Sequence, residues 1–451
     1  MLLWLWLLSC LVLALAQVNL SEVPSGLEVL EYNPRKVYNG YLLTCPEDED
    51  GVHGPRIYHP SGALFWGGPN WKNRCMNLQI QRYKDRNVLT FWYSVSGNEY
   101  AYGVILDQDY HDIGHVDPPG GPTAPSPVLT TRLAEFLIPG PDYTTAIMFT
   151  MRHYRDTMGA LGRLGGNPHG YIYDPLMQEV DIASGRVVYR WSAAEHLSLE
   201  DSYNDAAQTK GTWQWNTWDF SHGNSVMKDE AGDYVLSYRF LHQIVKVNGK
   251  TGNVIWKLGG KSSDFAFNNG STFIGQHDPR WVEGTDQTEM TIFDNDSDGV
   301  RSVPRWGTAR GIHVRLDYAA MTVTLLREFL PRVRQPADIE GSMRILPNGN
   351  VLVCYGSTGY ITEYTAEGEI VFDAYAKHVY RAFKYEQSVW PGEGLPDPDP
   401  IPPQAGSSSE GWGSGDTVLG AADETVKVDD GVTMYFSPIS CWGFRWALGR
   451  C

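Results

Sequence analysis

The hairpin pattern that decides the fold is Val245-Lys-Val-Asn-Gly-Lys-Thr-Gly252-Asn-Val-Ile-Trp256. Two short runs rich in β-branched residues flank a polar turn that contains glycine, which is typical of a β-hairpin. The same order of apolar strand, glycine turn and aromatic strand recurs around Gly62, Gly185 and Gly368. A supersecondary unit that recurs along a chain predicts an architecture built from repeats.

The spacing of these turns indicates how many repeats the chain holds. The intervals between successive turn glycines are 123, 67 and 116 residues. One interval is close to half of the others, which fits a unit of about 60 residues in which some turns lack the signature. The 451 residues include 47 Gly, 16 Trp and 25 Tyr, which is typical of many short strands joined by turns. A long all-β chain can protect its sheet edges by repeating small sheets around an axis. We therefore predict an all-β fold, a six-bladed β-propeller. A pair of β-sandwiches or a large barrel is the alternative.

The beginning of the chain has the composition of a targeting segment. Residues 1–16 form an uncharged apolar run that ends in Ala14-Leu15-Ala16, which predicts a signal peptide and a mature protein that starts at Gln17. A membrane anchor is the alternative, although the run is short for a bilayer span. We therefore expect a secreted, extracellular protein with no integral membrane span.

The rest of the chain divides by composition. We expect the propeller to occupy residues 17–390. Residues 391–425 are rich in Pro, Gly and Ser, which indicates an irregular surface segment. Residues 426–451 are expected to supply a C-terminal strand of the propeller, in a last blade that is either incomplete or closed by a Cys441–Cys451 bridge.

The cysteines fit an oxidising compartment, although their number outside the signal peptide is odd. Proximity along the chain favours the pairs Cys45–Cys75 and Cys441–Cys451. Cys354 lies in an apolar run and is expected to be a buried core thiol.

Charge and sequons limit the partners of this protein. The formal net charge of −17 argues against nucleic acid or an anionic membrane surface as a partner. Three sequons predict N-glycosylation at Asn19, Asn269 and Asn295, in agreement with secretion. Nothing in the sequence indicates an oligomeric state.

One candidate site motif is His222-Gly-Asn224, which precedes a predicted strand that ends near Arg239. In a propeller the loops and innermost strands face the axis, so these side chains are expected to converge on a central pocket. A guanidinium, an imidazole and an amide suit an anion with trigonal oxygens. The alternative is a capped turn with a surface arginine.

The second candidate motif is Gln276-His277-Asp278, also placed before a predicted strand. An imidazole with hydrogen-bonding neighbours can act as a nucleophile or as an acid–base group. The stretch from Asp294 to Gly299 begins like a calcium loop, but Arg305 stands where that loop needs glutamate, so we interpret it as an acidic turn. We expect no metal, and the absence of the common nucleotide, zinc and hydrolase motifs predicts no cofactor.

Six motifs occur in a fixed order: His222-Gly-Asn-Ser-Val, Gly252-Asn-Val-Ile-Trp256-Lys-Leu-Gly259-Gly260-Lys-Ser-Ser-Asp264-Phe265, Gln276-His277-Asp278, Phe293-Asp-Asn295, Pro347-Asn-Gly349-Asn350-Val-Leu and Tyr380-Arg-Ala-Phe383. In this order they resemble the arylsulfotransferase-like family of secreted fungal proteins. The likeness covers most of the chain, from Gly40 to Phe383. That family is related to bacterial aryl sulfotransferases that use no nucleotide sulfate donor.

The resemblance implies a six-bladed propeller with its active site on the axis. There a histidine takes a sulfuryl group from an aryl sulfate and passes it to a phenol. Carried over by motif, His277 matches the transient sulfohistidine nucleophile. His222, Asn224 and Arg239 match the groups that hold the sulfuryl oxygens and the leaving phenolate.

Two departures from the family pattern affect this expectation. Relatives carry a histidine motif on an earlier blade, where this chain has Ala134. An acid–base partner would then be missing, unless His153 or His169 takes its place. Relatives also continue through a further strand and sheet, whereas this chain reads through Met434 to a stop at Cys451.

Three functions remain open from the sequence. The first is an aryl sulfotransferase that acts on a small aromatic substrate, either a phenol or an aryl sulfate. The second is a diverged propeller enzyme that tailors a secondary metabolite by cyclisation or isomerisation, in a pocket with an aromatic wall near Trp213, Trp215 and Trp218. The third is a non-catalytic binding propeller.

Overall fold

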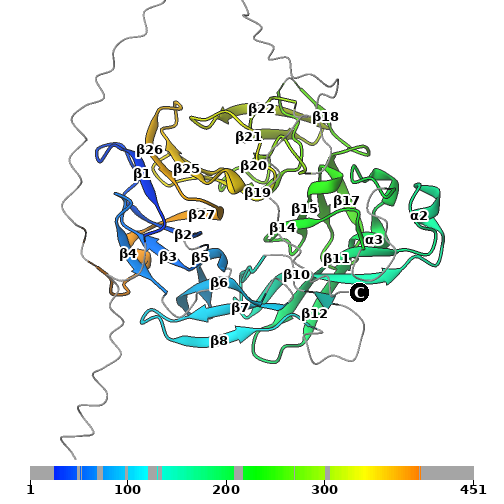
Figure 1. The fold of residues 1–451 in the computed structure, drawn as a ribbon, viewed down its shortest axis with the longest axis horizontal. Coiled ribbons are helices and arrows are strands. Elements are labelled where there is room, and N and C mark those ends of the chain that lie inside the picture. The colour runs from blue at the N-terminus through cyan, green and yellow to red at the C-terminus, as the bar shows by residue number, and fades with distance from the viewer. Residues whose placement is uncertain are drawn as a thin grey trace, which may run out of the picture. The chain divides into compact units, whose positions relative to one another are not determined.

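The computed structural model describes residues 25–47, 51, 53–68, 75–96, 100–119, 129–130, 135–207, 217–268, 270–299, 305–395 and 397. These residues form six sheets arranged in a ring (Figure 1), which confirms the predicted six-bladed β-propeller. Within these described residues, helix is confined to α2 (Ala160–Arg163), α3 (Ala193–His196) and short 3-10 turns.

Each blade has at least four strands, counted from the axis outward. The first blade consists of β27 (Val379–Glu386), β2 (Gly40–Pro46), β3 (Arg56–Tyr58) and β4 (Leu64–Gly67). The second consists of β5 (Cys75–Tyr83), β6 (Arg86–Ser96), β7 (Tyr100–Leu106) and β8 (Asp112–Val116). The third consists of β9 (Leu129–Thr130), β10 (Thr145–Arg155), β11 (Tyr171–Asp181) and β12 (Val187–Ser192), with β13 (Trp218–Asp219) beside β11.

The other three blades follow in chain order. The fourth consists of β14 (Gly223–Lys228), β15 (Tyr234–Tyr238), β16 (Gln243–Val247) and β17 (Val254–Gly259). The fifth consists of β19 (His277–Trp281), β20 (Glu289–Asp294), β21 (Arg310–Asp317) and β22 (Thr322–Phe329), with β18 (Ala266–Phe267) beside β22. The sixth consists of β23 (Ser342–Ile345), β24 (Val351–Cys354), β25 (Tyr360–Tyr364) and β26 (Ile370–Tyr375), with β1 (Glu28–Tyr32) at its outer edge.

The four turn glycines all connect the third strand of a blade to the fourth. Gly62, Gly185, Gly252 and Gly368 have φ values of 87°, 69°, 76° and 93°. Because a side chain opposes this left-handed conformation, glycine is favoured at each turn. The recurring sequence unit is therefore the outer hairpin of a blade, and the long intervals span two blades.

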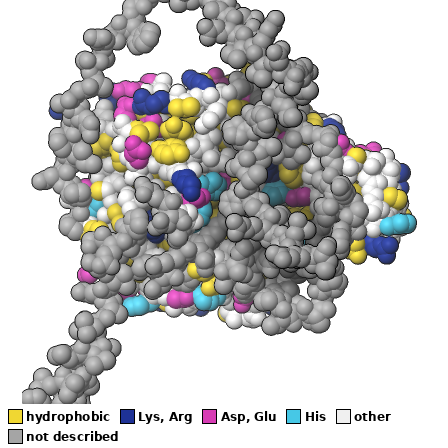
Figure 2. Space-filling model, viewed as in Figure 1, with side chains coloured by type: hydrophobic (Ala, Val, Ile, Leu, Met, Phe, Trp, Pro, Cys, Tyr) yellow, Lys and Arg dark blue, Asp and Glu magenta, His cyan; other side chains and the backbone are white. Residues whose placement is uncertain are grey.

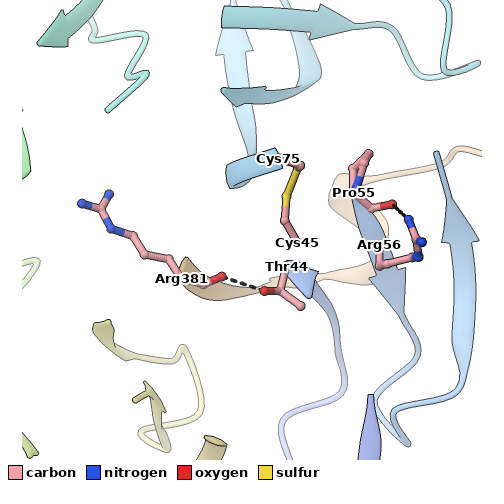
Figure 3. Close-up of a disulfide and its surroundings, with 6 residues drawn as sticks. All are labelled: Thr44, Cys45, Pro55, Arg56, Cys75 and Arg381. Atoms are coloured by element: carbon pink, nitrogen blue, oxygen red, sulfur yellow. Dashed lines mark hydrogen bonds between the residues drawn. A yellow bond between two sulfur atoms is a disulfide. The ribbon is translucent and has the colours of Figure 1, made fainter. Parts of the chain in front are cut away.

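The ring is closed by strands from both ends of the described chain. Strand β27 pairs with β2, so a late segment provides the innermost strand of the first blade. Strand β1 pairs with β26, so an early segment extends the sixth blade. Thr44 adds a hydrogen bond of 2.8 Å from its hydroxyl to the carbonyl of Arg381 (Figure 3). The strand expected in residues 426–451 lies outside the described residues.

One of the two predicted disulfides lies among the described residues. A Cys45–Cys75 disulfide joins β2 to β5 (Figure 3), as predicted, and Cys354 is a buried free thiol. Cys441 and Cys451 lie outside the described residues, as do the signal peptide at 1–16 and the segment at 398–425. Among the described residues, no helix is long and apolar enough to cross a membrane.

The prediction of a glycan at Asn295 is contradicted by the packing. This side chain is fully buried, and its amide nitrogen donates to the carbonyls of Ala337 and Glu340, at 3.0 and 2.9 Å. A glycosylated asparagine must be exposed at the surface. The other two sequons, at Asn19 and Asn269, lie outside the described residues.

Neighbouring blades pack through large apolar side chains. Between the third and fourth blades, Phe149, Trp191 and Tyr238 share one buried cluster. Burial of each such side chain contributes roughly 1.5–3 kcal/mol relative to exposure. This packing gives the innermost strands a rigid frame from which to present polar side chains.

Candidate active site

The predicted site residues meet at one end of the innermost strands. His222 immediately precedes β14, Arg239 immediately follows β15, and His277 begins β19. Since β14 and β15 are antiparallel, the start of one strand adjoins the end of the other, and the amide of Arg239 donates to the carbonyl of His222 at 3.1 Å. The Asn224 side chain then reaches the carbonyl of Gln276 at 2.7 Å. The two motifs therefore belong to one site.

Gly223 has no room for a side chain. A Cβ atom there would lie 2.7 Å from the ring of Phe149. His222, just before it, has a left-handed φ of 52°. The His-Gly pair therefore lets the chain pass close to the third blade and turn the imidazole toward the neighbouring loops.

His277 is buried and held by contacts at both ring nitrogens. Nδ1 lies 2.9 Å from the carbonyl of Gly275 and 2.8 Å from Oδ1 of Asn295, and both atoms are acceptors. Nε2 accepts a long hydrogen bond of 3.2 Å from the backbone N–H of Glu340. These partners assign the proton to Nδ1 and the lone pair to Nε2.

The surroundings of His277 oppose a positive charge on its ring. Burial, and then the positive charge of Arg239, lowers the pKa of His277 to about 3, and Arg381 acts in the same direction. An imidazole with this pKa is neutral at any physiological pH. Nε2 of His277 is therefore an unprotonated nitrogen beside guanidinium groups, which is the state that a nucleophile requires.

His222 is paired with a carboxylate. Its Nδ1 lies 2.5 Å from Oδ2 of Asp219, and the other carboxylate oxygen accepts from the backbone N–H of His222 at 2.9 Å. An acceptor at Nδ1 directs a proton there and leaves Nε2 for exchange with a ligand. The side chain is 29% exposed. His222 thus has the partner and the access that an acid–base group needs.

Arg239 is buried with its guanidinium only partly engaged. Nη2 donates to the carbonyls of Asp298 and Asp338. Nε is buried and has no hydrogen-bond partner among the described residues. A buried donor without a partner is costly, so it indicates a position where a ligand atom or water binds. The placement of this donor fits the predicted anion-binding role.

Asn224 was predicted to bind the substrate, but its side chain contacts the backbone of Gln276. Its amide nitrogen donates to the carbonyl of Gln276, so one N–H is used to position the segment that carries His277. The Gln276 side chain in turn donates to Ser237 Oγ and to the carbonyl of Gln243, at 3.1 and 3.0 Å. Asn224 therefore positions the nucleophile candidate, and its second N–H is what remains for a ligand.

An ion network missed by the sequence analysis joins several innermost strands. Asp278 lies 2.7 Å from Arg280, 2.5 Å from Arg344 and 3.5 Å from Arg381. Although burial alone would raise the pKa of Asp278, these three guanidinium groups hold it well below its usual range. Glu135 completes the network at 3.1 Å from Arg280 and 3.2 Å from Arg381.

This ion network also contacts the segment that carries Asn224. Arg381 also donates from Nη2 to the carbonyl of Asn224 at 2.8 Å, and Figure 3 shows its side chain extending away from the disulfide. Figure 2 shows histidine and charged side chains near the middle of the face it draws. The sequence carried one signal for Arg381, since this residue belongs to the Tyr380-Arg-Ala-Phe383 motif.

The aromatic surroundings differ from the predicted wall. Trp218 is 1% exposed and lies in the core between blades, with its indole N–H donated to Asn204 at 3.1 Å, so it does not line a pocket. Trp213 and Trp215 lie outside the described residues. Phe240 is the aromatic neighbour of the site, with its ring 5.3 Å from the His222 ring and 4.9 Å from the Arg239 guanidinium.

A cavity of about 370 Å³ lies beside these groups. It is lined by Tyr203, His242, Gly259, Gly260, Phe267, Thr272, Phe273, Ile274 and Arg305. Asp298 links it to the site, because its carboxylate lies 3.3 Å from His242 and its carbonyl accepts from Arg239. The aromatic lining and the single guanidinium suit a planar ligand with a negative group.

The acidic turn from Asp294 to Gly299 uses its carboxylates in contacts with neighbouring residues. Asp294 pairs with Arg310 at 2.9 Å, and Asp296 accepts from the backbone N–H of Arg305 at 2.7 Å, so both carboxylates make contacts within the protein. Ala134 lies outside the described residues. His169 is exposed, so it does not belong to the buried centre, while His153 is buried beside Thr217, 2.9 Å away.

Together these features define the class of the protein, a six-bladed β-propeller with an arginine-rich polar centre and two differently held histidines at one end of its axis. The chain belongs to the arylsulfotransferase (ASST) family, whose model matches residues 79–377. This confirms the arylsulfotransferase family inferred from the order of the motifs, while its secreted fungal branch stays a prediction. No curated protein matches the chain.

Several solved structures resemble this chain at low identity. A protein of unknown function from Bacteroides caccae is 10% identical with a TM-score of 0.43, over 77% of this chain and 99% of that one. The β-propeller domain of Cps50 (Swd1) from Myceliophteria thermophila is 10% identical with a TM-score of 0.40, over 76% of this chain and 89% of that one. A streptogramin B lyase is 11% identical with a TM-score of 0.35, over 78% and 86%.

Proposed function

We propose that the protein moves a sulfuryl group from an aryl sulfate to a phenolic acceptor through a covalent intermediate on His277. The observation that carries this proposal is the state of the His277 ring, neutral with its lone pair on Nε2 and with Arg239 beside it. Membership of the arylsulfotransferase family gives the class of substrate. The aromatic cavity beside Asp298 gives room for the ring.

In the first half-reaction Nε2 of His277 attacks the sulfur of the aryl sulfate. The N–S bond forms as the S–O bond to the aryl group breaks, and the phenolate leaves with the electron pair of that bond. The long hydrogen bond from the backbone N–H of Glu340 to Nε2 of His277 must break at this step. Protonated His222, held by Asp219, gives its Nε2 proton to the phenolate.

In the second half-reaction an acceptor phenol gives its proton to Nε2 of His222, which is now neutral. The phenol oxygen attacks sulfur, the S–O bond forms, and the N–S bond breaks with return of the lone pair to His277. Donors directed at the sulfuryl oxygens stabilise the charge that passes between the two oxygens. Arg239 is the donor best placed for this, because its Nε is buried and has no partner among the described residues.

The test is turnover of p-nitrophenyl sulfate with a phenol acceptor. We expect nitrophenolate release with sulfation of the acceptor in the natural protein, and loss of both in His277→Gln. His313→Gln is the matched control, since His313 is also a buried histidine of the fifth blade and is paired with Glu289 at 2.8 Å, away from the axis. Full activity of His277→Gln, or no turnover of any aryl sulfate by the natural protein, would reject the proposal.

We also propose that the protein is secreted. The apolar run at residues 1–16 supports this, and so does the Cys45–Cys75 disulfide, because such bridges persist in oxidising compartments. Sequencing the N-terminus of protein recovered from culture medium tests it. A sequence that starts at Gln17 is expected, and retention of all the protein inside cells would contradict it.

A further inference from the structure

Three side chains of types that can bind a metal ion lie opposite one another in the first blade. The β2–β3 register that pairs Thr44 with Arg56 continues to a bridge between Glu47 and His53. On the other side of β2, the backbone N–H of Glu47 donates to the carbonyl of His378 at 2.9 Å, which continues the pairing with β27. Directly opposite residues of a sheet place their side chains on the same face, with Cβ atoms about 5 Å apart.

The three side chains converge as this register requires. One ligand atom from each of Glu47, His53 and His378 lies within 4.8 Å of the other two. Oε2 of Glu47 is 3.3 Å from Nε2 of His53, and the two imidazole rings are 5.4 Å apart at an angle of 84°. The side chains are only 14%, 13% and 19% exposed. A single cation can therefore reach all three.

The surroundings match those of a metal-bound histidine. Nε2 of His378 lies 2.7 Å from Oε2 of Glu340. Metal-ligating histidines usually pair their second ring nitrogen with a carboxylate, which fixes the ring and strengthens the ligand. Glu340 would play this part, and Nδ1 of His378 would then face the metal.

Glu47 forms an ion pair with Lys377, which a metal ion would have to displace. Nζ of Lys377 lies 2.5 Å from Oε1 of Glu47, and the Lys377 side chain is 58% exposed. An exposed lysine can move into solvent at small cost, because surface ion pairs contribute little to stability. A divalent ion would replace this contact with a stronger one.

We propose that Glu47, His53 and His378 form a binding site for a divalent ion of the zinc type. Two imidazoles and one carboxylate are a known zinc ligand set, which leaves a fourth position for water. The ion would hold β2, the start of β3 and the loop before β27 together, at the place where early and late segments close the ring. It would also steady Glu340, whose backbone N–H contacts His277.

The experiment is zinc titration of the full-length protein after treatment with a chelator, by calorimetry and by thermal melting. We expect one zinc ion to bind this site and to raise the melting temperature, since a ligand that binds only the folded state stabilises it. Cobalt substituted for zinc should give the visible absorption of a four- or five-coordinate site. No binding of zinc by the natural protein would overturn the proposal.

Variants separate this site from others. His53→Ala and Glu47→Gln should weaken zinc binding at least about tenfold. His111→Ala is the control, because His111 belongs to a more exposed group with Asp107 and Asp109 in a single turn. If His53→Ala does not fold, Glu47→Gln, which preserves shape, decides the matter. Equal zinc affinity in the natural protein and in the folded site variants would overturn the proposal.

Discussion

Acidification should leave His277 neutral long after an ordinary histidine becomes charged. Burial and the charge of Arg239 lower the pKa of His277 to about 3. At pH 5 an ordinary histidine, with a pKa of about 6.5, is almost wholly protonated, whereas a group with this lowered pKa is protonated in only about one molecule in a hundred. The 15N shifts of the His277 ring should therefore report one neutral tautomer, with the proton on Nδ1, from pH 8 down to 5.

The same shift makes stability depend on pH. Between pH 6.5 and 3 the unfolded chain binds a proton at His277 and the folded chain does not, so the free energy of unfolding falls as the pH falls. The full effect is at most about 5 kcal/mol, present above pH 6.5 and lost toward pH 3. His277→Gln removes this titration, so its slope below pH 6 should be shallower by about 1.4 kcal/mol per pH unit.

Urea unfolding of the natural protein and of His277→Gln at several pH values between 4.5 and 7 measures this difference. The comparison of slopes does not depend on how much the substitution itself destabilises the fold. His169→Gln, at an exposed histidine outside the site, serves as the control. Equal slopes in the natural protein and His277→Gln, or a His277 ring that titrates near pH 6.5, would refute the assignment of a neutral nucleophile.

Three further predictions concern the frame of the site. Arg381→Met should lower the free energy of unfolding by about 3 kcal/mol in chemical denaturation, because Asp278 loses one of its buried partners while others remain; an unchanged midpoint would contradict the network. Replacing Cys45 and Cys75 together by serine should cost about 2–4 kcal/mol, seen as a lower melting temperature, and no change would show that the bridge does not constrain the chain. Burial raises the pKa of the Cys354 thiol to about 12, so a thiol reagent should label it only after denaturation, and rapid labelling of the folded protein would be the contrary result.

The sequence predicted the elements of this molecule that depend on local chemistry. The glycine turns at Gly62, Gly185, Gly252 and Gly368 were found because each turn requires a left-handed conformation near its own strands. Their spacing then gave the number of blades. The closing strand β27 was not predicted, because its pairing with β2 joins segments more than 300 residues apart, and no short pattern records such a pairing.

In the candidate site too, the residues that lie in local sequence motifs were predicted, and those brought in by distant segments were not. His222, Arg239 and His277 were predicted because their motifs lie just before or just after strands that face the axis. Glu340 was missed, since only its backbone N–H meets His277 and any residue type provides that group. Arg381 belonged to a recognised motif, but its role depends on ring closure, which brings it to Asn224 from 157 residues away.

The group formed by Glu47, His53 and His378 was not anticipated for a related reason. The three residues share one rung only because the β2–β3 register and the β2–β27 register coincide at Glu47. A shift of one residue in either register would turn a ligand to the opposite face of the sheet. The sequence alone does not fix register between distant strands.

The sulfuryl group that we propose on His277 can be trapped and located by mass spectrometry. The protein is mixed with p-nitrophenyl sulfate without an acceptor, quenched at alkaline pH and digested, and the peptide that contains His277 is analysed by mass spectrometry. We predict a mass increase of one sulfuryl group on His277 that disappears when a phenol is added before quenching. Release of nitrophenolate with His277 unmodified, or with the sulfuryl group on another residue, would show that His277 is not the nucleophile.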